Sequence, residues 1–277
     1  MDLRGKVAAV TGAARGIGEA TAIEFARRGC DIAVSDIDGD GVEETAEQAR
    51  RFGVEASARE LDVSDREGVH AWADEVAEEF GQVNFIVNNA GVSVTGTIEN
   101  ISYEDFEWLM NINFWGVING TKAFLPHIRR AGKGRVVNIS SAFGLVASPT
   151  QSAYNASKFA VRGFTESLRA ELSLEGTEVS ATCVHPGGID TAIVRSSRIS
   201  DTGPMERTPE EVIEEFENDL VRTSPEDAAT TIVDGVEKGK GRILVGSDAR
   251  VADIVSRLFP AIYPEPLAFI ARESWKK

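Results

Sequence analysis

Short β-branched runs alternate with longer segments of helical period along the first 246 positions of the chain. The first unit consists of VAAVT at 7–11, a helix from about Ile17 to Arg28, and DIAVSD at 31–36. The same pattern predicts strands at 54–61, 83–89, 135–140, 179–184 and 242–246, and helices at 40–52, 65–80, 103–130, 152–174 and 225–238. Helical crossovers between strands indicate one α/β domain, a Rossmann-type doubly wound sheet of seven parallel strands with helices on both faces.

Two segments depart from this alternation. Residues 187–208 are irregular, and a loop of this length in a compact domain is usually functional or disordered. A second segment, 247–277, follows the last predicted strand. Its apolar residues fall at helical spacing on one face, and prolines then break the regularity. The apolar residues are Val251, Ile254, Val255, Leu258, Phe259 and Ile262, and the prolines are Pro260, Pro264 and Pro266.

Composition and charge exclude several classes of partner. The net charge of −15 repels phosphodiester backbones and anionic lipid surfaces, so we expect no nucleic-acid partner. Cys30 and Cys183 adjoin or lie within apolar strands, which favours buried free thiols and a reducing compartment. The chain starts almost directly with a strand and has no run of about 18 apolar residues, so we expect a cytoplasmic protein without a membrane span.

A glycine-rich turn, TGAARGIG at 11–18, connects the first strand to the first helix. Glycine lets the backbone approach a pyrophosphate, whose charge is favoured by the free amides at the start of a helix. Asp36 closes the second strand at the distance where a carboxylate accepts hydrogen bonds from an adenosine ribose; the alternative is a loop or capping carboxylate. Asp62, at the end of the third strand, fits an adenine contact or a helix cap equally well. The small residues of NNAG at 88–91 would let the chain pass close to a cofactor.

Tyr154 and Lys158 lie four positions apart on a predicted helix and therefore share one face. A phenol with a pKa of about 10 is a poor base, but a positive charge about 4 Å away supplies roughly 4 kcal/mol to its anion. We therefore expect Lys158 to lower the pKa of Tyr154. Ser141 ends the fifth strand at the same edge of the sheet, as a substrate contact or a cap. Asn113 lies within a helix, where it is a poor helix former unless its amide bonds water or backbone.

These residues together resemble the short-chain dehydrogenase/reductase family in its single-domain form. The resemblance covers about 1–246 and rests on elements that occur in the family's order. They are TGAARGIG, Asp36, Asp62, NNAG, Asn113 in INFWG, Ser141 in NISS, YNASK at 154–158 and PGGIDT at 186–191.

The resemblance implies a role for each catalytic candidate. Tyr154 would exchange a proton with the substrate oxygen, and Lys158 would lower the pKa of Tyr154 and bind the nicotinamide ribose. Ser141 would hold the substrate oxygen, and Asn113 would position a water that connects Lys158 to solvent. The implied cofactor contacts are Gly12, Arg15, Gly16, Ile17, Gly18, Asp36, Asp62, Val63, Asn89, Ala90, Gly91, Tyr154, Lys158, Pro186, Gly187, Ile189 and Thr191.

Asp36 implies NAD as the cofactor, because a 2′-phosphate would be repelled by its carboxylate. Arg15 favours the alternative, NADP, because relatives that use NADP often carry a basic residue in this turn. The reaction class is hydride transfer between this cofactor and a secondary alcohol or ketone. The alternatives are an NADPH-dependent 3-oxoacyl reductase and a noncatalytic nucleotide-binding protein, which would not need Ser141, Tyr154 and Lys158 together.

The substrate is expected to be lipophilic, such as a steroid or a long-chain secondary alcohol. Ser141, Tyr154, Phe143 and Gln151 are the candidate substrate contacts. Further apolar residues could line the pocket or belong to the core; they are Val92, Val94, Leu145, Val146 and Ile189. His70, His127 and His185 lack metal-ligand spacing, so no metal is expected.

The resemblance also implies a substrate lid at about 190–222, where the irregular stretch leads into the acidic pattern PEEVIEEFENDL at 209–220. Residues 1–246 would form the catalytic domain. Relatives pair through their equivalents of helices 103–130 and 152–174, which predicts a homodimer or homotetramer. Most single-domain relatives end near the last strand. The extension 247–277 would therefore pack on the domain, contact a second subunit or cap its pocket.

Overall fold

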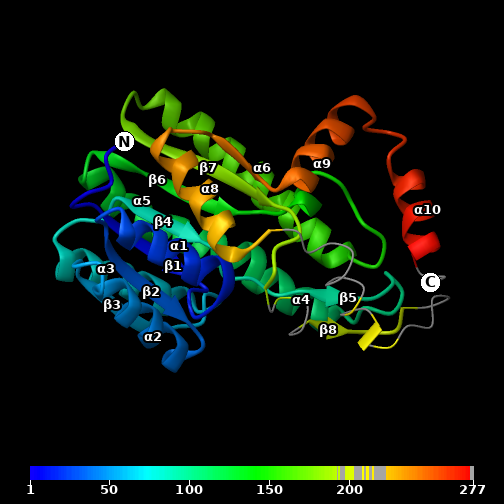
Figure 1. The fold of residues 1–277 in the computed structure, drawn as a ribbon, viewed down its shortest axis with the longest axis horizontal. Helices are drawn as coiled ribbons and strands as arrows, with labels where there is room; N and C mark the ends of the chain where they lie inside the picture. The colour runs from blue at the N-terminus through cyan, green and yellow to red at the C-terminus, as the bar shows by residue number, and fades with distance from the viewer. Residues whose placement is uncertain are drawn as a thin grey trace.

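Seven parallel strands form the central sheet of this computed structural model, which describes residues 1–191, 193, 197–202, 208, 210–211, 214 and 223–274 (Figure 1). The central strands β1 and β4 carry buried side chains along their whole length, as expected for a sheet covered on both faces. Across the sheet the order is β3 (Ala56–Glu60), β2 (Asp31–Asp36), β1 (Val7–Thr11), β4 (Phe85–Asn88), β6 (Lys133–Ile139), β7 (Glu178–Pro186) and β9 (Arg242–Val245). The strand order reverses between β1 and β4, and in such sheets ligands bind at the carboxyl ends of the strands at this point.

Helices cover both faces of the sheet, which confirms the predicted fold class (Figure 1). The first face is covered by α1 (Gly16–Arg27), α2 (Gly39–Arg50) and α8 (Pro225–Glu237). The second face is covered by α3 (Arg66–Phe80), α5 (Gly116–Arg130) and α6 (Ser152–Leu174).

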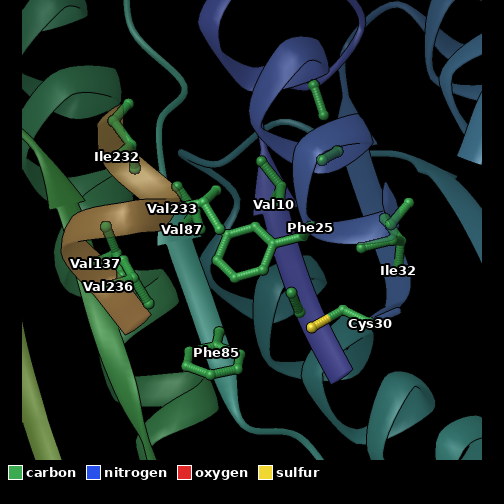
Figure 2. Packing of buried hydrophobic residues seen from close by; sticks show 14 of the residues in the cluster. Val10, Phe25, Cys30, Ile32, Phe85, Val87, Val137, Ile232, Val233 and Val236 are labelled. Atoms are coloured by element: carbon green, nitrogen blue, oxygen red, sulfur yellow. The ribbon is translucent and has the colours of Figure 1, made fainter. Parts of the chain in front are cut away.

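The core on the first face is centred on Phe25 and Phe85, whose ring centroids are 5.5 Å apart. Ile232, Val233 and Val236 of α8 belong to the same buried cluster as these rings (Figure 2). Burying one such side chain stabilises the fold by about 1.5–3 kcal/mol. Cys30 and Cys183 are buried free thiols, as the sequence predicted.

The predicted helix at 103–130 is interrupted. It consists of α4 (Tyr103–Met110), a π-helical turn (Asn111–Trp115) and α5. One reason is the Asn113 side chain, which bonds the main chain of Val92 instead of solvent or its own helix. π-Helical turns inside α-helices are often found at functional sites.

Two features were not predicted. A short parallel pair, β5 (Val94–Thr95) with β8 (Arg198–Ile199), joins the region before α4 to the expected lid. Helical structure also resumes beyond the prolines of the extension, because α9 (Ser247–Leu258) is followed by α10 (Pro264–Ser274). Pro264 is the first residue of α10. Proline is tolerated there because the first N–H groups of a helix have no hydrogen-bond partner within the helix. The predicted acidic helix at 209–220 lies almost wholly outside the described residues.

Candidate active site

Tyr154 and Lys158 lie one turn apart near the start of α6, and Ser141 lies just beyond β6. The Lys158 Nζ is 5.5 Å from the centroid of the Tyr154 ring. Tyr154 and Ser141 share a side-chain hydrogen bond. The structure therefore brings together the three residues that the sequence assigned to proton transfer. Ser141 also accepts a hydrogen bond from the main-chain N–H of Phe143. Its hydroxyl therefore caps the turn after β6 while it contacts Tyr154.

The electrostatics of the pair differ from the expectation. Burial raises the pKa of Tyr154 to about 12, against the opposing effect of its hydrogen bond with Ser141. Burial likewise lowers the pKa of Lys158 to about 8. The Lys158 ammonium donates to the main-chain O of Ile139 at 3.1 Å. Burial is the largest cause of both shifts, and it disfavours the charged form of each side chain.

Asn113 uses its whole amide on the protein. Its Oδ1 accepts from the N–H of Val92 at 2.8 Å, and its Nδ2 donates to the O of Val92 at 2.9 Å and to Ser157 at 3.3 Å. A Cβ added to Gly91 would lie 3.3 Å from Asn113 Oδ1 and 3.5 Å from Lys158 Nζ. Asn113 thus fixes the Gly91–Val92 segment beside Lys158, and its side chain is bonded to backbone, one of the two uses that the sequence suggested.

The glycine-rich turn has the close packing that its proposed ligand requires. A Cβ on Gly12, whose φ is +65°, would lie 2.6 Å from Ala90 Cα, and one on Gly18 would lie 2.0 Å from the O of Gly12. Asn89 Nδ2 donates to the O atoms of Thr11 and Gly12 at 3.0 and 2.9 Å and fastens NNAG to this turn.

The start of α1 at this turn is open to an anion. Arg15, at the position before the helix, makes no side-chain cap, so no side chain at that position competes for the first amides of Gly16, Ile17 and Gly18. Gly16, whose φ is +61°, also brings the turn close to Thr191: a Cβ there would lie 3.2 Å from Thr191 Cγ2. The glycine cradle and the uncapped helix fit the pyrophosphate of a dinucleotide.

Asp36 lies at the end of β2, beside the glycine-rich turn. Its two carboxylate oxygens accept the main-chain N–H groups of Ala14 and Asp38, each at 3.2 Å. Arg15 forms an exposed ion pair with Asp38 at 3.7 Å. The sequence analysis did not identify Asp38 as a residue of this region. Its position two residues after Asp36 could have indicated it.

Asp62 and Val63 lie beyond β3. Asp62 accepts from the N–H of Ser64 at 2.8 Å, which closes its own turn, and the cap position of α3 belongs to Asp65. The helix-cap interpretation of Asp62 is therefore wrong. Val63 is buried, and a Cβ on Gly116 would lie 2.7 Å from its Cγ2.

Pro186 is the last residue of β7, and Gly187 begins the turn that follows. The N–H of Gly188 donates to Asp248 Oδ2 at 2.6 Å. No motif in the sequence identified Asp248. Ile189 is buried in the main core, so it faces the protein interior.

The candidate substrate contacts divide into two groups. Phe143 packs edge-on against Tyr154, with ring centroids 6.3 Å apart, and Val92, Phe106 and Trp108 belong to the same apolar cluster as Tyr154. Gln151 instead donates to Thr95 Oγ1 at 2.8 Å and accepts from Ser93 at 3.4 Å, so its amide is occupied by the protein.

The other apolar candidates are mostly core residues. Val94 and Leu145 are almost fully buried, and Val146 is nearly so. His185 is also buried, with its Nδ1 3.0 Å from the O of Ser141, and burial lowers the pKa of its imidazole to about 4.

Within the part of the chain that the structure describes, no three His, Cys, Asp or Glu side chains are gathered so that they could hold a metal ion. In that same part, every helix is too short or too polar to cross a membrane.

Comparison with known proteins agrees with this geometry. A family model described as short chain dehydrogenase matches residues 6–201. The putative oxidoreductase SadH of Mycobacterium tuberculosis is 46% identical over 264 residues, 95% of this chain and 94% of that protein. Estradiol 17-beta-dehydrogenase 11 of Mus musculus is 33% identical over 92% of this chain and 80% of its own. The crystal structure of a short-chain dehydrogenase/reductase from Burkholderia phymatum in complex with NAD matches with a TM-score of 0.85 at 27% identity, covering 95% of this chain and 97% of that one.

Proposed function

Because this chain belongs to the short-chain dehydrogenase/reductase family, we propose that it moves a hydride between NAD and a lipophilic secondary alcohol or ketone. It is an oxidoreductase of the class that acts on CH–OH groups. The observation that carries the proposal is the grouping of Ser141 and Tyr154 with the buried Lys158 at the carboxyl edge of the sheet.

The chain's own residues would move the proton. Bound NAD would supply the hydride acceptor. Tyr154 would take the proton of the alcohol at its phenolic oxygen, or return it to the ketone in the reverse direction. Ser141, already hydrogen-bonded to Tyr154, would hold the substrate oxygen beside it. Lys158 would stabilise the phenolate by its charge, and Asn113 would keep Gly91 and Val92 in place beside Lys158.

The pyrophosphate would lie against Gly12, Gly16 and Gly18 at the open start of α1. NAD is favoured over NADP because the carboxylates of Asp36 and Asp38, beside the glycine-rich turn, would repel a 2′-phosphate on the adenosine ribose. Arg15, the residue that could accept such a phosphate, is paired with Asp38. Two similar short-chain dehydrogenases have crystal structures that contain NAD, which supports this choice.

A lipophilic substrate is supported by the apolar surroundings of Tyr154, which include Phe143, Phe106 and Trp108. The name of the mouse relative, an estradiol dehydrogenase, points to the same class.

We further propose that residues 1–246 form the catalytic domain, that 190–222 form a lid over the substrate, and that 247–277 pack beside the site.

The test is a panel of secondary alcohols that includes short-chain, long-chain and steroid members, with NAD or NADP, followed by the absorbance of the reduced nicotinamide. We expect turnover with NAD and, by calorimetry, an affinity for NAD at least about tenfold above that for NADP. In Asp36→Ala the difference between the two affinities should be smaller. Tighter binding of NADP would reverse the cofactor assignment. Failure to bind either dinucleotide would overturn the proposed function.

A further inference from the structure

The C-terminal extension contacts both sides of the candidate active site. Asp248, in the first turn of α9, accepts the N–H of Gly188 in the turn that follows β7. Tyr263, just before α10, accepts the N–H of Ala147 at 3.2 Å through its hydroxyl. Ala147 lies on the segment between Ser141 and Tyr154. Figure 1 places α9 and α10 at the end of the molecule opposite to β3 and α2.

From these contacts we propose that the extension is a brace for catalysis, in which Asp248 positions the nicotinamide-binding turn and Tyr263 positions the substrate-side segment. Both are positioning residues, since neither is placed against substrate or cofactor. The inference rests on the proposed function, because it assigns the 186–188 turn to the nicotinamide end of NAD.

The packing around Asp248 is closely matched to this turn. A Cβ on Gly187 would come within 2.0 Å of both carboxylate oxygens, and one on Gly246 would lie 2.4 Å from Oδ1. The glycines on both sides therefore leave just enough room for the carboxylate. Its Oδ1 is buried and has no hydrogen-bond partner among the described residues, so the bond from Gly188 to Oδ2 is what holds the group in place.

A second acidic residue of α9 provides a contrast. Asp253 pairs with Arg242 at 2.7 Å and with Arg257 at 2.9 Å, and these contacts fasten α9 to β9 and to itself. Within the described residues, Asp253 forms no hydrogen bond or ion pair with the 186–188 turn. Asp253→Ala is therefore a matched control that weakens the attachment of α9 and leaves the turn alone.

The experiment compares the binding of NAD with that of ADP-ribose, which is NAD without its nicotinamide. In Asp248→Ala we expect the Kd for NAD to rise about tenfold, equivalent to about 1.4 kcal/mol, while the Kd for ADP-ribose stays within twofold. Asp248→Asn retains an oxygen acceptor for Gly188 and should return the Kd for NAD to within about threefold of the wild type. Asp253→Ala should leave the ratio of the two Kd values unchanged.

The cofactor half of the proposal would be overturned if Asp248→Ala left the ratio of the Kd for NAD to the Kd for ADP-ribose unchanged. It would also be overturned if Asp253→Ala changed that ratio equally, or if Asp248→Asn failed to restore the affinity for NAD. Because a ratio of affinities is measured on folded protein, loss of stability alone does not shift it. If the wild type binds neither ligand, the proposed function itself fails, which is a different result from wild-type binding with an unchanged ratio.

Tyr263→Phe tests the substrate half separately. It removes the acceptor for Ala147 and keeps the ring, so we expect the KM for the alcohol to rise about threefold while the Kd for NAD stays unchanged. Tyr103→Phe, at a side chain that is 86% exposed, is the control and should change neither value. An unchanged KM in Tyr263→Phe would overturn this half.

Discussion

Burial acts in opposite directions on the two ionisable residues of the site. It raises the pKa of Tyr154 and lowers that of Lys158, so both are driven toward their neutral forms. A neutral tyrosine is a proton donor at neutral pH, which suits reduction of a ketone. Oxidation of an alcohol needs the phenolate, and the charge of Lys158 is the group in reach that would stabilise it.

Tyr154→Phe removes the exchangeable proton and keeps the aromatic packing against Phe143. General acid–base catalysis contributes about 10²–10⁴ in rate, so kcat should fall by at least this factor while NAD binding is retained. Steady-state kinetics and calorimetry on the same preparation measure both quantities. Tyr103→Phe serves as the control, and near-normal turnover in Tyr154→Phe would contradict the assignment.

Lys158 should also make the stability of the protein depend on pH. Its pKa falls from 10.5 in the unfolded chain to about 8 in the fold, so between these values the unfolded chain binds more protons. The free energy of unfolding should therefore rise with pH from 8 toward 10.5, and the full difference corresponds to about 3 kcal/mol. Above pH 10, Tyr154 opposes this trend because its raised pKa stabilises the fold only while the phenol stays protonated.

Lys158→Met tests this linkage by removing the buried charge at similar volume. The variant should be more stable than the wild type at pH 7, by up to about 3 kcal/mol, and this advantage should shrink between pH 8 and 9.5. Urea unfolding at a series of pH values measures it, with Lys122→Met at an exposed position as the control. A variant less stable than the wild type at pH 7 would show that Lys158 is not penalised by burial.

At the scale of the elements, the π-helical turn between α4 and α5 depends on Asn113. Asn113→Ala would leave the part-buried N–H and O of Val92 without their side-chain partners. An unsatisfied buried group costs about 1–3 kcal/mol, so the free energy of unfolding should fall by about 3 kcal/mol, and kcat should fall as Gly91 moves beside Lys158. Chemical denaturation measures the first effect. Asn111→Ala, exposed in the same turn, should change neither, and equal losses in both variants would argue against a specific role for Asn113.

The strands and most helices could be predicted because the pattern of apolar residues within each segment is enough to indicate the element. β1 and β2 have the predicted bounds, and α6 begins at Ser152 and ends at Leu174 as expected. The π-helical turn and the β5–β8 pair were not predictable, because each depends on partners distant in sequence. Arg198 pairs with Val94 about 100 positions away, and two-residue strands carry no periodic signal.

The same distinction applies to the site. Tyr154 and Lys158 could be grouped from the sequence because residues four apart share one face of a helix. Ser141 could be added because it follows a strand that ends at the same edge of the sheet. Gln151 was assigned to substrate from its place in the chain, whereas its amide holds Ser93 and Thr95. Asp38 and Asp248 were missed because their contacts depend on where other loops fold.

At the scale of the whole molecule, apolar side chains remain exposed in two regions. Trp115 of the π-helical turn and Phe159 of α6 lie in the segments that the family resemblance predicts to pair, and both are partly exposed. The outer face of α9 exposes Val251, Ile254 and Leu258, and its exposed charges are Arg250 and Arg257, because Asp253 faces the body of the protein. Since the chain carries a net charge of −15, such a face suits the acidic surface of a second copy. We therefore expect a homodimer or homotetramer.

The double variant Ile254→Glu/Leu258→Glu tests whether α9 belongs to this assembly. The two side chains are 55% and 66% exposed, so the monomer should keep its fold, while two buried carboxylates would oppose a contact with a second acidic copy. Light scattering should report a smaller assembly than the wild type, with Tm nearly unchanged. Phe52→Glu, just beyond α2 and 48% exposed, is the control and should keep the wild-type mass. If the double variant also keeps that mass, α9 lies outside the contact, and pairing would rest on α5 and α6 alone.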